Sequence, residues 1–299
     1  MEQSQLPPHG RSDDILLGRP DQVNLPVHQL AAQLRLPEYK YSHSIGMLVQ
    51  GESKYITWTF PDTLRSVQLL QLTDIQWGHI CCKRERVIEY RDWVLAQPNR
   101  FMVWTGDNID AAHMLSRGTT WENTGTPQNQ LFEFCRVWAP ARHRILGYVG
   151  GNHERRCISV YGDLGITIAA LLQIPYSRGK QIIDIRFGKW QPFKISQWHG
   201  MGGARTMGTV AQNLYRFASD GDADLYLMGH HHKPMIIPFW KERYGANGTV
   251  RAAKVFAAAG SSFLETWGSY AEVAGYSPSD VMMPRAILDA KGGFELTLR

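Results

Sequence analysis

The chain has 299 residues, 43% of them hydrophobic and 20% charged, which is the composition of an ordinary globular protein with a sizeable buried core. We find no apolar run of membrane-spanning length, no secretory pattern in the first residues and no Cys-x-x-Cys pair, so a membrane protein, a zinc ribbon and a redox pair are not expected. The net charge of +5 and the pI of about 9.0 favour a polyanionic partner, and the four cysteines indicate free thiols in a cytoplasmic protein.

The first part of the chain differs from the rest. Residues 1–60 hold scattered prolines and little periodicity, so we expect a partly irregular N-terminal extension there and the main domain at residues 61–299. From residue 67, apolar runs typical of buried strands alternate with helical patterns. Strands are expected at 67–73, 101–105, 145–149, 225–228, 254–258, 286–288 and 294–298, a hairpin at 181–187 and 193–198, and helices at 83–97, 128–137 and 206–219.

The expected buried strands end in short loops that hold Asp, Asn or His near a glycine. In layered α/β folds, ligands bind beyond the carboxyl ends of the strands, where such loops converge. In chain order, the loops read Asp74-Ile75-Gln76, Gly106-Asp107-Asn108-Ile109-Asp110, Gly151-Asn152-His153-Glu154, His199-Gly200 and Gly229-His230-His231-His232. Five such loops can meet at one point, as a site with several metal ligands requires.

Local roles explain several of these residues when each stands alone. Asp74 suits a turn, Asp107 and Asp110 suit helix caps, and a lone His199 is commonly an interior histidine with its hydrogen bonds satisfied. Clustered histidines after a buried strand have no such packing role. Because carboxylates can bridge cations and imidazoles bind divalent transition metals, the joint pattern indicates a metal cluster.

The motif order resembles the calcineurin-like metallophosphoesterase superfamily. That family's pattern is Asp-x-His, Gly-Asp-x-x-Asp, Gly-Asn-His-Glu/Asp, a later His-Gly and Gly-His-x-His, and the matches run here from Asp74 to His232. The resemblance implies an α/β fold in which two mixed β-sheets pack as a sandwich flanked by helices, in four layers. It also implies a hydrolase of phosphoesters with a dinuclear metal centre.

The resemblance assigns metal ligands position by position. The expected ligands are Asp74, Gln76 and His232 for the first metal, Asn152, His199 and His230 for the second, and Asp107 as the bridge between them. His231 is expected to be a bystander in the histidine run.

The same resemblance assigns the catalytic side chains. His153 would contact the phosphoryl oxygen or protonate the leaving group, while Asp110 and Glu154 would orient the ligands and His153. Because two metals can clamp the attacking and leaving oxygens and lower the pKa of bound water, we expect direct attack by a metal-bound hydroxide.

One position departs from the pattern of the superfamily. Gln76 stands where the superfamily has a histidine, and a carbonyl oxygen suits Mn or Mg better than Zn or Fe. His79, three residues on, is an alternative ligand. We therefore expect two divalent ions, manganese first, with Zn, Fe, Ni and Mg as alternatives.

The motifs leave the substrate open, because selectivity lies in flanking loops. We expect a phosphodiesterase or nuclease acting on nucleic acid or nucleotides, with Arg155, Arg205 and Trp77 as substrate contacts. The alternatives are a phosphomonoesterase of phosphoproteins or nucleotides, and a non-catalytic binding scaffold of the same fold. No membrane partner is expected, and the sequence does not predict the oligomeric state.

Overall fold

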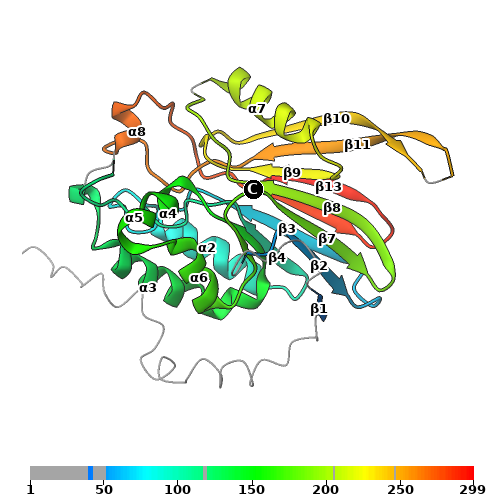
Figure 1. Ribbon diagram of the computed structural model, residues 1–299, viewed down its shortest axis with the longest axis horizontal. Helices are drawn as coiled ribbons and strands as arrows, with labels where there is room; N and C mark the ends of the chain where they lie inside the picture. Colours follow the sequence, from blue (N-terminus) through cyan, green and yellow to red (C-terminus); the bar gives the residue numbers. More distant parts are fainter. Residues whose placement is uncertain (1–39, 43–51, 117–119, 205, 246) are drawn as a thin grey trace, which may run out of the picture. The chain divides into compact units, whose positions relative to one another are not determined.

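The computed structural model describes residues 40–42, 52–116, 120–204, 206–245 and 247–299. Two β-sheets dominate this part of the chain (Figure 1). The first has the strand order β1 (Lys40–Ser42), β2 (Tyr55–Phe60), β7 (Gln181–Phe187), β8 (Trp190–Trp198), β9 (Leu225–Met228), β11 (Val250–Ala259) and β10 (Met235–Tyr244). The second has the order β13 (Phe294–Leu298), β12 (Pro284–Asp289), β3 (Ser66–Leu72), β4 (Arg100–Trp104), β5 (Ile145–Val149) and β6 (Tyr176–Ser177). Both sheets are mixed, because each contains parallel and antiparallel pairs.

Helices occupy the connections between the strands. They are α2 (Arg84–Leu95), α3 (Pro127–Trp138), α4 (Asn152–Arg156), α5 (Ile158–Tyr161), α6 (Leu164–Leu172), α7 (Met207–Ser219) and α8 (Tyr270–Val273), with 3₁₀ turns at Thr120–Glu122 and Ala139–Arg144. Local chemistry sets their starts: Thr126 caps α3 by accepting a hydrogen bond from the N–H of Asn129, with Pro127 in the first turn. No helix of the described residues has the length and apolar character needed to cross a membrane.

Three apolar cores define four layers. Because side chains alternate along a strand, Leu69 of β3 faces the other sheet while its neighbour Leu70 faces the helices. Residues of α2, α3 and α6 pack on the outer face of the six-stranded sheet, and α7 packs on the outer face of the seven-stranded sheet through a core that includes Leu214 and Tyr226. The predicted fold class, a two-sheet sandwich flanked by helices, is confirmed.

Most predicted elements are confirmed, and β5, β9 and β13 begin and end as expected. The long edge strand β10 and the helix α6 were not predicted. Residues 1–39 and 43–51 of the expected N-terminal extension lie outside the described residues. β2 precedes the expected boundary at residue 61 but pairs in parallel with β7 along its whole length, so we propose that the main domain begins before β2.

Parallel pairing brings the motif loops together. β3, β4 and β5 run in parallel in one sheet, and β8 and β9 run in parallel in the other. The Gln71 side chain joins the two sheets at this end, donating hydrogen bonds to the hydroxyl of Thr105 at 2.7 Å and to the carbonyl of Met228 at 2.9 Å. The carboxyl ends of all five strands therefore open onto one place.

Candidate metal centre

A cavity of about 490 Å³ lies at the carboxyl ends of these strands. Six motif residues line it, namely Asp107, Asp110, Asn152, His153, His230 and His232. The rest of the wall includes His79, Leu115, Arg156 and Tyr270. Side chains from loops far apart in the sequence thus face a shared space that is large enough for a small ligand.

One half of the site is a compact group of ligand atoms. Asp107, His199 and His230 each offer an atom within 4.8 Å of the others, and no other group of three or more such residues occurs among those described. The Nε2 atom of His199 lies 3.2 Å from Oδ2 of Asp107 and 3.0 Å from Oδ1 of Asn152. These four side chains are the set expected for the second metal.

Backbone carbonyls fix both imidazoles of this group. The Nδ1 atom of His199 lies 2.6 Å from the carbonyl oxygen of Thr105, and the Nε2 atom of His230 lies 2.6 Å from that of Gly202. Each of these nitrogens carries a proton and donates it to the carbonyl, so the opposite nitrogen is the one that can offer a lone pair to a cation once its own proton has left. Such anchoring is common for metal-binding histidines.

The other half of the site contains Asp74, His232 and Gln76. Oδ2 of Asp74 accepts hydrogen bonds from the Thr73 hydroxyl at 2.6 Å and from the His230 N–H at 2.9 Å. Its Oδ1 atom lies 3.2 Å from Nε2 of His232 and has no hydrogen-bond partner among the described residues. Because a buried, unpaired carboxylate oxygen is unfavourable, this donor set fits a divalent cation.

The backbone of these loops is unusual. Seven described non-glycine residues have φ in the left-handed region, and five of them are expected metal ligands. These five are Asp74 (49°), Gln76 (49°), Asp107 (54°), His230 (73°) and His232 (54°). Since such conformations are unfavourable for residues with a Cβ and tend to cluster at functional sites, the strain marks the loops as functional.

Electrostatic shifts in the group follow from burial and charge. Burial opposes the charged form of Asp107, but His153 and His199 outweigh it and hold the pKa of the Asp107 carboxyl well below its usual range. Burial also opposes the charged form of His199, but Asp107 and Asp74 raise its pKa to about 9. The site therefore attracts positive charge, which protons supply when no cation is bound.

His153 forms a pair with Asp110. Its Nδ1 atom lies 3.1 Å from Oδ1 of Asp110, and its Nε2 atom lies 3.6 Å from Oδ2 of Asp107. Although burial opposes both charges, the two acids raise the pKa of His153, and the pKa of Asp110 falls to about 2 mainly because of His153. Asp110 thus lies in contact with His153, where it could orient the imidazole.

Glu154 is expected to orient both the metal ligands and His153, and its described contacts include the loop of the expected ligand Asp107. No described contact joins its carboxylate to the ring of His153. Instead, this fully buried carboxylate accepts hydrogen bonds from the backbone N–H groups of Asp107 (3.2 Å), Asn108 (2.7 Å) and Gly151 (3.0 Å). A fourth bond comes from the hydroxyl of Tyr148 at 3.0 Å. Glu154 therefore ties the second motif loop to the third.

The expected substrate contacts need correction. Trp77 is buried in the helical core and donates from Nε1 to Glu133 at 3.0 Å, so it cannot flank a substrate. Arg155 is exposed, donates to the carbonyl of Gly151 and does not line the cavity, whereas the neighbouring Arg156 does. Arg205 lies outside the described residues.

The structure also places His79, the alternative ligand, and His231, the expected bystander. His79 lines the cavity, but its Nδ1 accepts the N–H of Cys81 and its Nε2 lies 3.6 Å from Glu122. The side chain of Gln76, by contrast, reaches an expected ligand, because its Nε2 atom lies 3.4 Å from Nε2 of His232. His231 is buried and contacts Asn213 of α7 at 3.2 Å, away from the ligand group.

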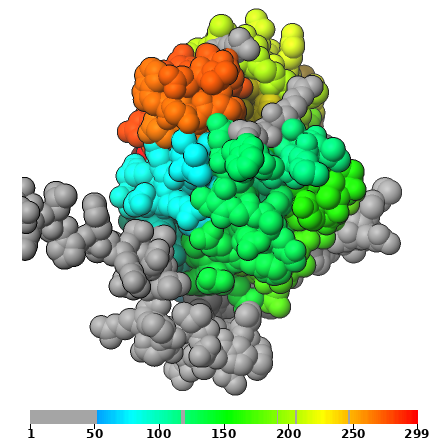
Figure 2. Space-filling model, turned by 90° about the vertical axis from the view of Figure 1, so that its left-hand side faces the viewer, coloured from blue at the N-terminus to red at the C-terminus, as the bar shows by residue number. Residues whose placement is uncertain are grey.

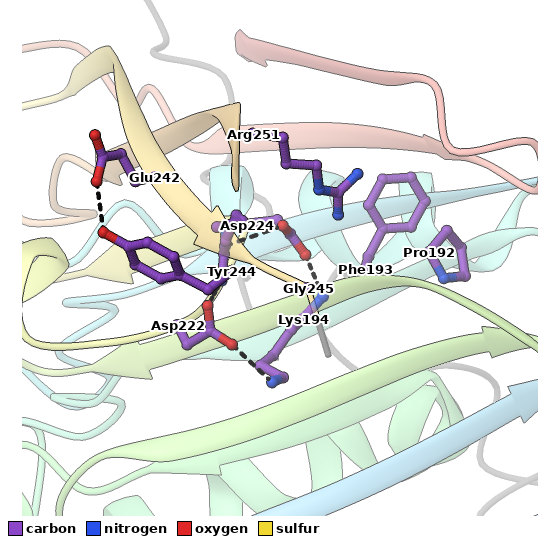
Figure 3. A pocket seen from close by; sticks show the side chains of 10 residues that line it. Pro192, Phe193, Lys194, Asp222, Asp224, Glu242, Tyr244, Gly245 and Arg251 are labelled. Atoms are coloured by element: carbon purple, nitrogen blue, oxygen red, sulfur yellow. Dashed lines mark hydrogen bonds and ion pairs between the residues drawn. The ribbon is translucent and has the colours of Figure 1, made fainter. Parts of the chain in front are cut away.

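A second cavity of about 490 Å³ lies at the opposite ends of β9 and β11 (Figure 3). Lys194 pairs with Asp222 at 3.5 Å, and the Tyr244 hydroxyl donates to Glu242 at 2.5 Å. Three acids and three bases line it, namely Asp222, Asp224, Glu242, Lys194, Arg243 and Arg251. The balanced charges favour neither an anion nor a cation, so the first cavity remains the candidate site.

No protein-family model matches the chain, and no curated protein sequence matches it significantly. Similar solved structures include a metallophosphoesterase from Sphaerobacter thermophilus, with 17% identity, a TM-score of 0.37 and coverage of 78% of this chain and 87% of that one. A predicted phosphoesterase from Streptococcus pneumoniae has 14% identity, a TM-score of 0.33 and coverage of 79% and 100%. Vps29 from Chaetomium thermophilum has 9% identity, a TM-score of 0.34 and coverage of 78% and 96%. What this chain does is therefore inferred from its own residues.

Proposed function

We propose that this chain is a metal-dependent phosphoester hydrolase that holds two divalent cations. One observation carries the proposal: side chains of three motif loops line one cavity, and His199 and Asp74 of the other two loops lie 3.2 Å from Asp107 and His232 of that lining, respectively. Five of the expected ligands also have backbone conformations that a purely structural role does not require. The motifs also resemble those of the calcineurin-like metallophosphoesterases in type and order.

The two halves of the site would bind their cations differently. Asn152, His199 and His230 would hold one cation, and their anchored imidazoles favour tight binding. Asp74, Gln76 and His232 would hold the other, and Asp107 would bridge the two. Because the set of Asp74, Gln76 and His232 offers one imidazole where the other set offers two, we expect it to bind its cation more weakly and to favour Mn²⁺. The cations would supply charge neutralisation and lower the pKa of bound water.

The remaining polar side chains of the cavity suit phosphoryl transfer. His153, whose pKa is raised by its carboxylate partners Asp107 and Asp110, would donate a proton to the leaving oxygen from its Nε2 atom. Arg156, whose Nη2 lies 4.0 Å from Oδ1 of Asp110, would bind a phosphoryl oxygen. Asp110 would keep both cationic groups in place.

We propose a phosphodiester of a nucleotide or nucleic acid as the substrate. The net charge of +5 and the arginine in the cavity wall support a polyanion. A phosphomonoester would fit the same metal chemistry and is the main competitor. The free state of all four cysteines is compatible with the cytoplasm as the place of action.

Hydrolysis of an aryl phosphodiester and of an aryl phosphomonoester with added Mn²⁺, alongside the metal content of the chain, tests the proposal. We expect turnover, with the diester preferred. Asp107→Asn should reduce the rate by roughly 10³-fold or more and leave one bound metal or none. Asp92→Asn, an exposed position on α2, is the matched control and should change neither. A chain that binds metal but hydrolyses neither ester would overturn the enzyme and leave a binding scaffold.

A further inference from the structure

The side chain that contacts Gln76 comes from nearly two hundred residues further along the chain. The Tyr270 hydroxyl lies 3.0 Å from Nε2 and 3.4 Å from Oε1 of Gln76. The Tyr270 ring lies edge-on to the imidazole of His79, with 6.0 Å between the ring centroids. Tyr270 therefore forms the part of the cavity wall that connects Gln76 with His79.

The backbone holds Tyr270 firmly in this place. Ser269 caps α8 by accepting the N–H of Ala271, and the N–H of Glu265 donates to the carbonyl of Cys81 at 2.8 Å. Figure 2 shows the α8 segment in orange against the cyan segment that follows β3. The same segment supports the metal loop itself, because Phe263 donates its N–H to the carbonyl of Asp74 at 3.0 Å.

The contact solves a problem that a glutamine ligand poses. A free glutamine side chain loses conformational entropy when it is fixed, and only its carbonyl oxygen can bind a cation. The Nε2 atom of the Gln76 amide lies 3.4 Å from Nε2 of His232. A 180° rotation of the amide exchanges its nitrogen and oxygen, and an oxygen at that position would be close to the spacing of about 3 Å between neighbouring ligands of an octahedral cation. The Tyr270 hydroxyl can both donate and accept, so it can hold the amide with its oxygen at that position.

We propose that Tyr270 is a positioning residue for the first metal, and that Gln76 and Tyr270 act as one unit where the resembled superfamily has a histidine. The unit presents a hard oxygen ligand, so it makes this half of the site favour Mn²⁺ over Zn²⁺. The inference rests on the proposed function, because it requires that Gln76 faces a cation. Its test measures metal affinity and does not depend on turnover.

The experiment is calorimetric titration of the metal-free full chain with Mn²⁺ and, separately, with Zn²⁺. The wild type should show a tight and a weak Mn²⁺ site. Tyr270→Phe should weaken the weak Mn²⁺ site about 5–10-fold, as expected for one lost hydrogen bond, and leave the tight site within about twofold. Tyr161→Phe is the matched control, because Tyr161 lies edge-on to His113 at 6.3 Å, away from the metal loops.

The same Tyr270→Phe change in a Gln76→His variant distinguishes a positioning role of Tyr270 from a general disturbance of the fold. In Gln76→His, an imidazole needs no tyrosine to orient it, so adding Tyr270→Phe should change neither affinity by more than about twofold. Unchanged weak-site affinity in Tyr270→Phe, an equal loss in the Gln76→His background, or only one Mn²⁺ site in the wild type would each overturn the inference. A wild type that binds two ions but hydrolyses no phosphoester would overturn the proposed function alone.

Discussion

Glu154→Gln tests how the metal loops are held. The buried carboxylate accepts two hydrogen bonds on each oxygen, from three backbone N–H groups and the Tyr148 hydroxyl. Glutamine has nearly the same shape but replaces one oxygen with an NH₂ group, so two buried donors lose their acceptor. At about 1–3 kcal/mol for each unsatisfied donor, the free energy of unfolding falls by roughly 2–6 kcal/mol.

One effect opposes this loss. Burial and the negative charge of Asp107 raise the pKa of Glu154, so the carboxylate repels Asp107 when both are ionised. Glutamine removes that repulsion, and we therefore expect a net loss of about 2–4 kcal/mol in the free energy of unfolding.

Urea unfolding of the metal-free chain, followed by circular dichroism, measures the change without a contribution from bound metal. Glu89→Gln is the control, since Glu89 is an exposed residue of α2 that pairs with Arg86, and it should cost less than about 1 kcal/mol. If Glu154→Gln unfolds with the same free energy as Glu89→Gln, the carboxylate does not hold the loops together.

Two further predictions concern other parts of the fold. Gly151→Ala places a Cβ against Oδ1 of Asp107, so the variant should fold with a displaced Asp107 and bind Mn²⁺ at least about tenfold more weakly, by calorimetry; wild-type affinity would show that the loops can give way. Burial, with Arg144 and Arg142 nearby, lowers the pKa of His143 to about 4 from 6.5. The unfolded chain then binds the extra proton first, so stability falls as pH drops from about 6.5 to 4. His143→Gln should flatten that fall in urea unfolding at pH 7 and 5, and equal pH dependence in both chains would contradict a half-buried histidine with a lowered pKa.

Parts of the fold were predictable because the local pattern and the tertiary environment agree. β5 and β9 are short apolar runs closed by glycine, and both are buried on both faces, so their bounds follow from the sequence. The sequence did not predict β10 because it is an edge strand in which exposed residues alternate with half-buried ones from Pro238 onward. It also contains a proline and the charged run from Lys241 to Arg243, which are unusual inside a sheet. Its strand character comes from pairing with β11, which no local pattern encodes.

The candidate site divides in the same way. Motif order put the expected ligands on five loops, and the structure brings these loops together because parallel strands share the edge at which they end. Side-chain direction was not predictable: Trp77 turns into the core although it adjoins a ligand, and Arg156 enters the cavity where Arg155 does not. Tyr270 carries no motif and is far from Gln76 in sequence, so only the folded chain reveals it.

If the proposed function holds, the left-handed backbone at five expected ligand positions lowers the stability of the fold where the site needs these side chains. Glycine adopts this conformation without penalty, whereas another residue costs of the order of 1 kcal/mol, less for aspartate. Together the five positions lower the free energy of unfolding by an amount that is a sizeable share of the roughly 5–15 kcal/mol of a typical domain. In a lineage freed from selection for hydrolysis, substitutions to glycine or asparagine at Gln76, His230 and His232 would make the chain more robust. In related sequences, then, decay of the activity would be accompanied by a more stable fold.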